Sequence, residues 1–480
     1  MQPAKAADIS RGGTCCVLIR DSPTLEREPS VVNTQKPVWQ VFLMFLGPMM
    51  LANILQSLSG TLNNIFLGKM IGVGALAAAS SFFPIMLFLI SFVMGLGSGA
   101  SVLIGQAWGA KQPERVQAVA GTTLSVGLIG GLVVAVFGGS FAHSLLETLK
   151  TPPDIIDDAT AYARIVMISS PGFFVFLLFT SVMRGVGDMV TPLKALVVST
   201  IVGMIVTPAL IRGWGGLPKL GVASAAVAMA ASFVVALLWL GIHLHRKGSP
   251  LAPSAGLLRH MRIERKILVA VLRIGIPTAM QMVIMSLAEV ALLSLVNGFG
   301  SGATAAYGAS NQILGYVQFP AMSIAIAASI LGAQAIGAGH TERLGAITRA
   351  GILINFAVTG SLLVLCYLFS RSIVGLFTTD TTVIEITQRM LHIVLWSTLI
   401  FGCSAVVSGV MRSSGAVMIP VLLSISAIVL VEVPVAFIAS RHFGIDGVWA
   451  AYPAAFIAML LFQSTYYRLV WRRQKIQRLI

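Results

Sequence analysis

Long apolar runs, separated by short polar breaks, fill the chain from about residue 38 onwards. The runs lack the two-residue alternation of barrel strands, and each is long enough for a helix to cross a bilayer, which takes roughly 20 residues. We therefore predict an all-α polytopic membrane protein. Twelve transmembrane helices fit, near residues 38–67, 75–107, 115–138, 160–183, 190–211, 220–245, 268–298, 303–337, 344–369, 386–410, 417–440 and 447–469.

The longest polar break between the spans divides them six and six. It reads "RKGSPLAPSAGLLRHMRIERK", and both ends of the chain beyond the spans are also polar. Because the first 36 residues are polar and mixed in charge, we predict a disordered cytoplasmic tail there. The predicted organisation is a tail at 1–36, an N-lobe at 37–246, a cytoplasmic linker at 247–266, a C-lobe at 267–470 and a basic cytoplasmic tail at 471–480.

An internal repeat relates the two halves. "SVLIGQAWGAKQPER" at 101–115 aligns with "SILGAQAIGAGHTER" at 329–343, and "VMRGVGDMVTP" at 182–192 aligns with "VMRSSGAVMIP" at 410–420, both 228 residues later. Near the start of each half, "LGP" at 46–48 faces "GIP" at 275–277. An even number of spans per half keeps both lobes in the same orientation. The sequence thus predicts two pseudo-symmetric six-helix lobes, with a substrate path between them suited to alternating access.

Composition and charge agree with a membrane protein. The chain is 56% hydrophobic and only 10% charged, whereas soluble domains carry about 25% charged residues. A net charge of +15 would suggest nucleic acid in a soluble protein. Here it is better explained by topology, since placing both termini and the linker inside puts most Lys and Arg on the cytoplasmic side. We expect a plasma-membrane monomer in the lipid bilayer, with cytoplasmic termini and no nucleic-acid partner.

Four cysteines show neither metal-ligand spacing nor a disulfide framework. They are Cys15, Cys16, Cys366 and Cys403. Free thiols are the favoured interpretation, and acylation of Cys15 and Cys16 is the alternative. We predict no metal, no cofactor and no catalytic residues.

Only two of the 17 Asp and Glu residues lie inside predicted spans: Glu289 and Glu432. A carboxylate at bilayer depth is costly unless it is paired, hydrated or protonated, so it is a functional candidate by default. On a helical wheel, Met282, Met285 and Ser286 share the face of Glu289. Glu289 is predicted to bind a proton, Na⁺ or a cationic substrate, against the alternative of a helix-packing hydrogen bond. Glu432, among apolar neighbours, carries the same two alternatives.

Other polar residues inside the spans are weaker candidates. Arg184 and Arg412 recur in both halves at helix ends, where we expect anchoring and capping of backbone carbonyls. The residues that could line a substrate cavity, or else hydrogen-bond between helices, are Asn63, Gln281, Tyr307, Asn311 and Gln318, besides Met282, Met285 and Ser286 of the Glu289 face.

The repeat blocks resemble the multidrug and toxic compound extrusion (MATE) family. The first half carries "LGP", "NNIFLGKMIGVGALAAAS", "GQAWGA" and "MRGVGDMVTP", and the second half carries "GIP", "GFGSGATAAYGAS", "AQAIGA" and "MRSSG". The resemblance, over about residues 40–465, implies a bacterial inner-membrane antiporter. Such an antiporter exports amphipathic, often cationic, small organic compounds in exchange for H⁺ or Na⁺.

The chain departs from the family at the N-lobe cation site. Bacterial members often carry an Asp where Asn63 stands, and an Asn and an Asp in the fifth helix, where this chain has Gly203 and Thr207. The resemblance therefore leaves the seventh-helix acid, matched by Glu289, as the coupling candidate. A tenth-helix acid is also missing near Cys403, and we infer that Glu432 takes its place.

Two other functional classes fit less well. A lipid-linked glycan flippase of the same overall shape is the alternative function, and it should line its cavity with several cations for a pyrophosphate. A membrane-embedded enzyme needs acids, His or Cys clustered near one interface, and the sequence shows no such cluster.

Overall fold

The computed structural model describes residues 37–216, 218–252, 261–375 and 380–479, and all regular structure among them is helical. The first half contains α1 (Val38–Met70), α2 (Val73–Ser81), α3 (Phe83–Gly109), α4 (Pro113–Val133), α5 (Gly139–Thr148), α6 (Ile156–Ile168), α7 (Ser170–Val186), α8 (Val190–Arg212) and α9 (Ala223–Lys247). The second half contains α11 (Arg265–Asn297), α12 (Ser301–Ala338), α13 (Leu344–Leu368), α14 (Ser370–Gly375), α15 (Thr381–Val394), α16 (Ser397–Ser413), α17 (Met418–Ala427), α18 (Val433–Phe443) and α19 (Ile445–Leu469). Two π-helical segments, Val134–Gly138 and Ile428–Glu432, join α4 to α5 and α17 to α18. The predicted tail at 1–36, with Cys15 and Cys16, lies outside the described residues, as does part of the linker.

The described helices confirm the all-α membrane fold. Ten are long and apolar enough to cross a bilayer, and two bent pairs bring the number to twelve. The pairs are α6 with α7, bent by 52°, and α15 with α16, bent by 45°. At each break a serine hydroxyl, on Ser170 or Ser397, bonds to the carbonyl three residues earlier. The predicted spans 160–183 and 386–410 are therefore broken helices. At the first break, Pro171 in the first turn of α7 lacks the N–H that would continue the helix of α6.

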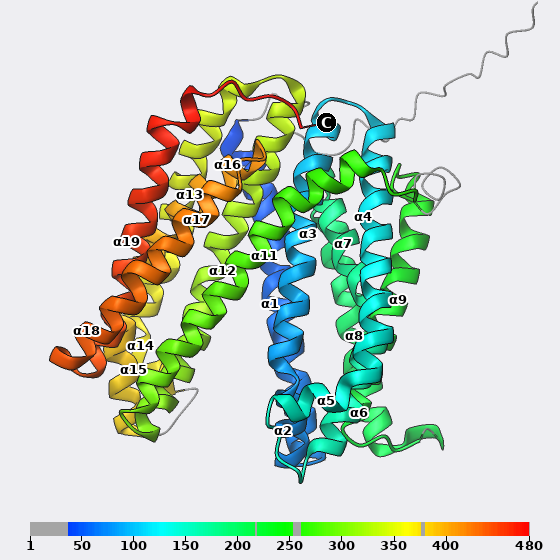
Figure 1. Cartoon of the computed structure of the whole chain (residues 1–480), viewed down its shortest axis with the longest axis vertical. Coiled ribbons are helices and arrows are strands. Elements are labelled where there is room, and N and C mark those ends of the chain that lie inside the picture. The colour runs from blue at the N-terminus through cyan, green and yellow to red at the C-terminus, as the bar shows by residue number, and fades with distance from the viewer. Residues whose placement is uncertain (1–36, 217, 253–260, 376–379, 480) are drawn as a thin grey trace, which may run out of the picture.

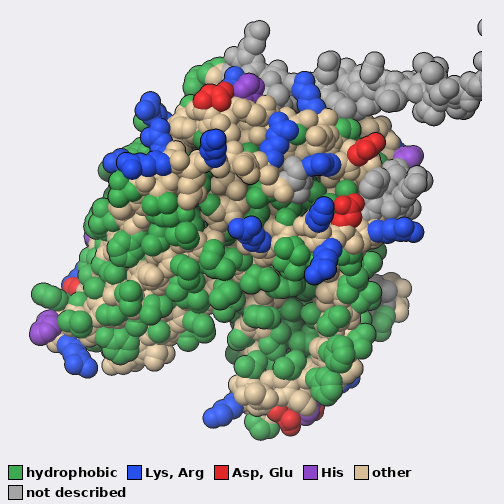
Figure 2. All heavy atoms as spheres, turned by 45° about the horizontal axis from the view of Figure 1, so that its top comes forward, with side chains coloured by type: hydrophobic (Ala, Val, Ile, Leu, Met, Phe, Trp, Pro, Cys, Tyr) green, Lys and Arg blue, Asp and Glu red, His purple; other side chains and the backbone are tan. Residues whose placement is uncertain are grey.

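The helices form two lobes that are packed together at one end and separate toward the other. Figure 1 shows the lobes converging at the end where the C-terminus lies and diverging toward the other end. Figure 2 shows a notch between the two lobes at the diverging end. We call these the closed end and the open end.

The first helix of each half packs partly on the opposite lobe. Val41, Phe42 and Phe45 at the start of α1 join a buried cluster with α12, α13 and α16 of the second half. Conversely, Ile267 and Val271 at the start of α11 belong to the large buried cluster of the first half. The lobes therefore exchange the starts of their first helices near the closed end. The predicted boundaries divide the sequence into two halves, but the buried core of each lobe includes residues from the other half.

The repeated Gln-containing blocks bring α3 and α12 into backbone contact at the closed end. The Gln106 amide donates to the Ser413 carbonyl at 2.8 Å, and the Gln334 amide donates to the Gly185 carbonyl at 3.2 Å. These two bonds are related by the internal repeat, and each joins one lobe to the other. A Cβ on Gly337 would collide with the Gln106 carbonyl, so only glycine permits this approach.

The segment after α19 covers the same junction. The Leu479 N–H donates to Gln106 Oε1 at 2.8 Å, and Trp471 Nε1 donates to Ser414 Oγ at 2.9 Å. The Leu479 side chain packs against Gly415. Residues 471–479 therefore contact both lobes across the closed end.

Adding one methyl group at the α3–α12 contact should destabilise the protein. We expect Gly337→Ala to cost about 1–3 kcal/mol, because its Cβ overlaps a backbone carbonyl that cannot move without separating the helices. Gly308→Ala in the same helix is the matched control, since nothing lies within 4 Å of its Cβ. The measurement is the melting temperature in detergent. Equal melting temperatures for the two variants would show that the contact is not tight.

Candidate functional site

The Glu432 carboxyl lies where a transmembrane helix is locally widened. Glu432 closes the π segment Ile428–Glu432 and is buried, with 7% of its surface exposed. Pro434 follows two residues later, and its ring lacks an N–H and crowds the carbonyl four residues before it. A π segment at this place relieves that conflict, and such distortions are found often at functional sites.

The structure brings the two carboxylates of the spans into one region of the C-lobe. Glu432 lies within electrostatic range of Glu289. The Tyr307 hydroxyl donates to the Glu289 carbonyl at 3.4 Å and is 3.1 Å from the Tyr452 hydroxyl. The Tyr307 ring also stacks on Trp449, with centroids 5.8 Å apart. The sequence did not indicate Tyr452, because only the folded structure brings α19 next to Tyr307 of α12.

Glu289 faces the space between the lobes. Its side chain is exposed, whereas Ala288 beside it is buried. At 100° per residue, Glu289 shares a helix face with Met282 and Thr278, and both line the cavity between the lobes. Among the described residues, neither Glu289 nor Glu432 forms an ion pair with Lys or Arg.

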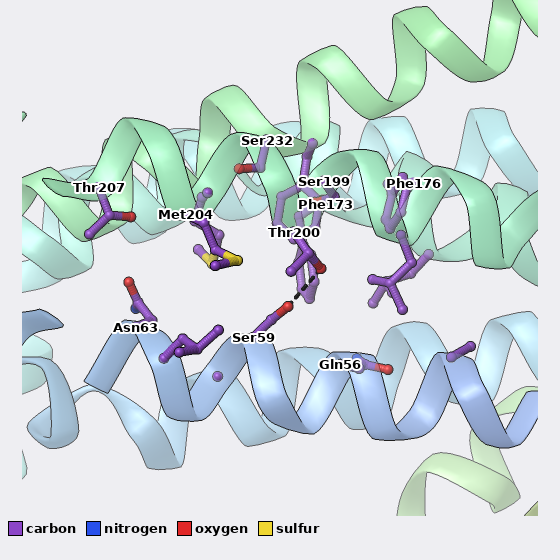
Figure 3. Close-up of a pocket in the computed structure, with 18 of the residues that line it drawn as sticks. Gln56, Ser59, Asn63, Phe173, Phe176, Ser199, Thr200, Met204, Thr207 and Ser232 are labelled. Carbon is purple, nitrogen blue, oxygen red and sulfur yellow. Dashed lines mark hydrogen bonds between the residues drawn. The ribbon is translucent and has the colours of Figure 1, made fainter. Parts of the chain in front are cut away.

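A second polar region is a cavity of about 220 Å³ inside the N-lobe, between α1 and α8. Figure 3 shows Asn63 and Thr207 at one end of it and a hydrogen bond between Ser59 and Thr200, at 2.7 Å, in its middle. Gly203 also lines it, so the three positions at which the family resemblance leads us to expect cation ligands lie around this one cavity. The lining residues include no carboxylate, and Arg184 is their only charged member.

A third polar region is a cavity of about 190 Å³ between the lobes. Gln281 and Met282 of the predicted set line it, together with Arg184 and Arg412. We expected the two arginines to cap backbone carbonyls at helix ends. In the structure they border the cavity instead, and Arg412 donates to Ser98 Oγ at 3.5 Å.

A buried glutamine, which nothing in the sequence pattern marks, forms part of the wall of this cavity on α19. Gln463 accepts a hydrogen bond from Ser404 at 2.9 Å and donates one to Ser424 at 2.8 Å. It therefore ties together α16, α17 and α19. A glutamine near a helix end has no periodic signal that would mark it as buried.

The remaining predicted residues are spread around these regions. Met285 packs against the C-lobe core, and Ser286 donates to the Met282 carbonyl at 3.1 Å. Asn311 lies beside the Tyr307 hydroxyl, and Gln318 is half-buried in α12. Their roles in a substrate cavity stay predictions. Cys403, where a tenth-helix acid is missing, is buried and accepts a hydrogen bond from Asn355 at 3.6 Å.

Both halves of the chain match the same protein-family model. A family model described as MatE matches residues 48–209 and again residues 277–438, which together make up more than half of the chain. The chain belongs to the MATE family. The double match also reproduces the internal duplication, with one MATE unit in each half.

Individual MATE proteins match over nearly the full length. The probable multidrug resistance protein YoeA of Bacillus subtilis (strain 168) is 43% identical over 95% of this chain and 99% of its own. The multidrug export protein MepA of Staphylococcus saprophyticus is 24% identical over 88% of this chain and 92% of its own.

Solved MATE structures share the fold. An outward-facing multidrug resistance MATE family transporter superposes with a TM-score of 0.83, at 22% identity, over 93% of this chain and 96% of its own. A MATE protein in its straight conformation gives the same TM-score over 94% and 98%. The resemblance noted in the sequence is thereby confirmed, and the protein is a multi-pass membrane transporter of this family.

Removing the amide at the cavity wall should cost stability. We expect Gln463→Leu to lower stability by about 1–3 kcal/mol, because the buried Ser404 hydroxyl loses its acceptor. Gln312→Leu on the exposed side of α12 is the control, with no buried partner to lose. Thermal denaturation in detergent compares the two, and a Gln463→Leu protein as stable as wild type would mean that its polar contacts are dispensable.

Proposed function

We propose that the protein is a secondary antiporter that exports amphipathic, often cationic, small organic compounds in exchange for H⁺ or Na⁺. The names of its relatives, a probable multidrug resistance protein and a multidrug export protein, support the substrate class. The observation that carries the coupling mechanism is the approach of Glu289 to Glu432, without a Lys or Arg partner among the described residues.

Two carboxylates close enough to interact electrostatically favour the binding of a cation. They repel each other when both are charged, and a proton or Na⁺ bound by either one would reduce that repulsion. A cationic substrate entering from the notch meets Glu289 first, because Glu289 is exposed and Glu432 is buried. Ion and substrate would therefore compete for the same negative charge, which is the requirement for exchange.

The N-lobe cavity has a different role in this proposal. Its lining offers hydroxyls, amides and aromatic rings but no carboxylate, so no acid there can carry the coupling proton. It would contact the substrate's polar and apolar parts. Coupling would then depend on the C-lobe alone.

The shape of the two lobes supports a mechanism of alternating access. Lys and Arg gather on the face of the closed end (Figure 2), and the positive-inside rule would make this the cytoplasmic side. The structure would then be open to the outside. One charge moving inward through 100 mV supplies about 2.3 kcal/mol, enough to drive a large substrate gradient.

Neutralising the exposed acid should abolish coupling. We expect Glu289→Gln to eliminate efflux driven by an imposed pH or Na⁺ gradient in proteoliposomes, and Glu432→Gln to reduce it strongly, because an amide cannot exchange a proton or balance a cation. Glu147→Gln, on the exposed surface of α5, is the control. Uphill efflux retained by Glu289→Gln would refute the assignment.

The orientation can be tested separately by labelling. In a background with all four cysteines replaced, Gln112→Cys at the closed end should resist a membrane-impermeant maleimide applied to intact cells. Glu147→Cys at the open end should react, and both should react after lysis, since both positions are exposed. Labelling of Gln112→Cys in intact cells would reverse the assignment.

A further inference from the structure

Two arginines related by the internal repeat border the cavity between the lobes. Arg184 lies in the last turn of α7 and Arg412 in the last turn of α16, 228 residues apart in the sequence. Both line the same cavity, one from each lobe. We propose that they form an anion-binding subsite, which holds the carboxylate, sulfonate or phosphate group of an amphipathic organic molecule.

The guanidinium groups lack protein partners for their charge. Among the described residues, Arg184 makes no hydrogen bond or ion pair, and Arg412 reaches only the Ser98 hydroxyl, at 3.5 Å. The Arg412 Nε is buried without a hydrogen bond. By contrast, Lys247 close by in the N-lobe pairs with buried Asp188 at 3.1 Å. Charged groups inside a membrane protein are costly unless they are paired or serve a pathway, so two arginines without ion-pair partners in one cavity indicate a site suited to an anion.

Nearby structural features do not neutralise this charge. Each arginine lies at a helix C-terminus, but a helix end offers only about half an elementary charge. No Asp or Glu is among the residues that line the cavity. Glu289 follows Thr278, a lining residue, by eleven positions, which at 1.5 Å per residue places it roughly 16 Å further along α11. The acid and the arginines are therefore separate sites on one path.

The rest of the cavity wall fits an amphipathic ligand. Donors and acceptors come from serine hydroxyls, Thr278 and Gln281, while soft apolar surface comes from Met94, Met282 and Met459. Methionines adapt to ligands of different shape. A guanidinium group can donate two parallel N–H hydrogen bonds to an acidic group. This geometry suits carboxylate, sulfonate and phosphate alike.

Binding of an organic anion needs no ion gradient, so the subsite can be tested independently of the proposed antiport. The probe is 2-naphthalenesulfonate, with neutral 2-naphthylmethanol as its uncharged counterpart. Calorimetric titration would use the full chain in nanodiscs of phosphatidylcholine, with empty nanodiscs as blank. We expect saturable sulfonate binding that Arg184→Gln or Arg412→Gln weakens about tenfold or more, as expected for loss of a charge-assisted hydrogen bond.

Matched variants separate binding from folding. Arg184→Lys and Arg412→Lys keep the charge and should retain more affinity than the Gln variants. Arg273→Gln, exposed on α11 and outside the cavity lining, should bind as wild type does. Absence of saturable binding in wild type, or equal affinity in the Gln variants, would overturn the proposal. The same applies if 2-naphthylmethanol binds equally well and loses affinity in the same variants.

The acidic group could come from a soluble compound or from a lipid headgroup. Adding phosphatidylglycerol to the nanodiscs distinguishes them: arginine-dependent competition against the sulfonate identifies a lipid phosphate as an occupant, and its absence assigns the subsite to soluble anions. Wild-type protein that exports cations but does not bind the sulfonate would refute only the anion subsite. Protein that binds the sulfonate but fails to export cations would refute only the antiport function.

Discussion

The close approach of α3 and α12 is the contact on which the rest of the structure depends. Two helices from different lobes can touch backbone to backbone only because Gly337 and Gly109 carry no side chain. Lipid gives helices little hydrophobic reason to associate, so such packing and the two reciprocal glutamine bonds carry the association. With one end held shut in this way, the lobes can separate at the other end, and the inter-lobe cavity lies between them.

The internal duplication places equivalent groups opposite each other at this junction. Gln106 and Gln334 bond across it in the same manner, and Arg184 and Arg412 border the cavity from either side. The carboxylates break the symmetry, since both Glu289 and Glu432 belong to the C-lobe, while the lining of the N-lobe cavity contains no carboxylate. The contacts that join the two lobes are therefore symmetric, whereas the acidic residues within the spans are confined to one lobe.

The sequence predicted the fold well because hydropathy and duplication are strong, local signals. It singled out Glu289 and Glu432 because an acid in an apolar run is conspicuous. It gave the wrong surroundings for Arg184 and Arg412, since a cation near a helix end looks like an anchor whether it faces lipid headgroups or a cavity. Tyr452 and Gln463 were missed because their partners come from distant helices. Contacts of that kind depend on helix rotation and bending, such as the breaks at Ser170 and Ser397, which hydropathy does not encode.

The exchange of first helices between the lobes has a consequence for biosynthesis. When the first six spans have entered the membrane, the core of the N-lobe still lacks Ile267 and Val271, which α11 supplies only after the linker is made. The start of α1 likewise waits for α12 and α13 before its aromatic side chains are covered. Each half is therefore an incomplete folding unit. An insertion intermediate with only six helices should be a substrate for membrane chaperones and proteases until the second half arrives.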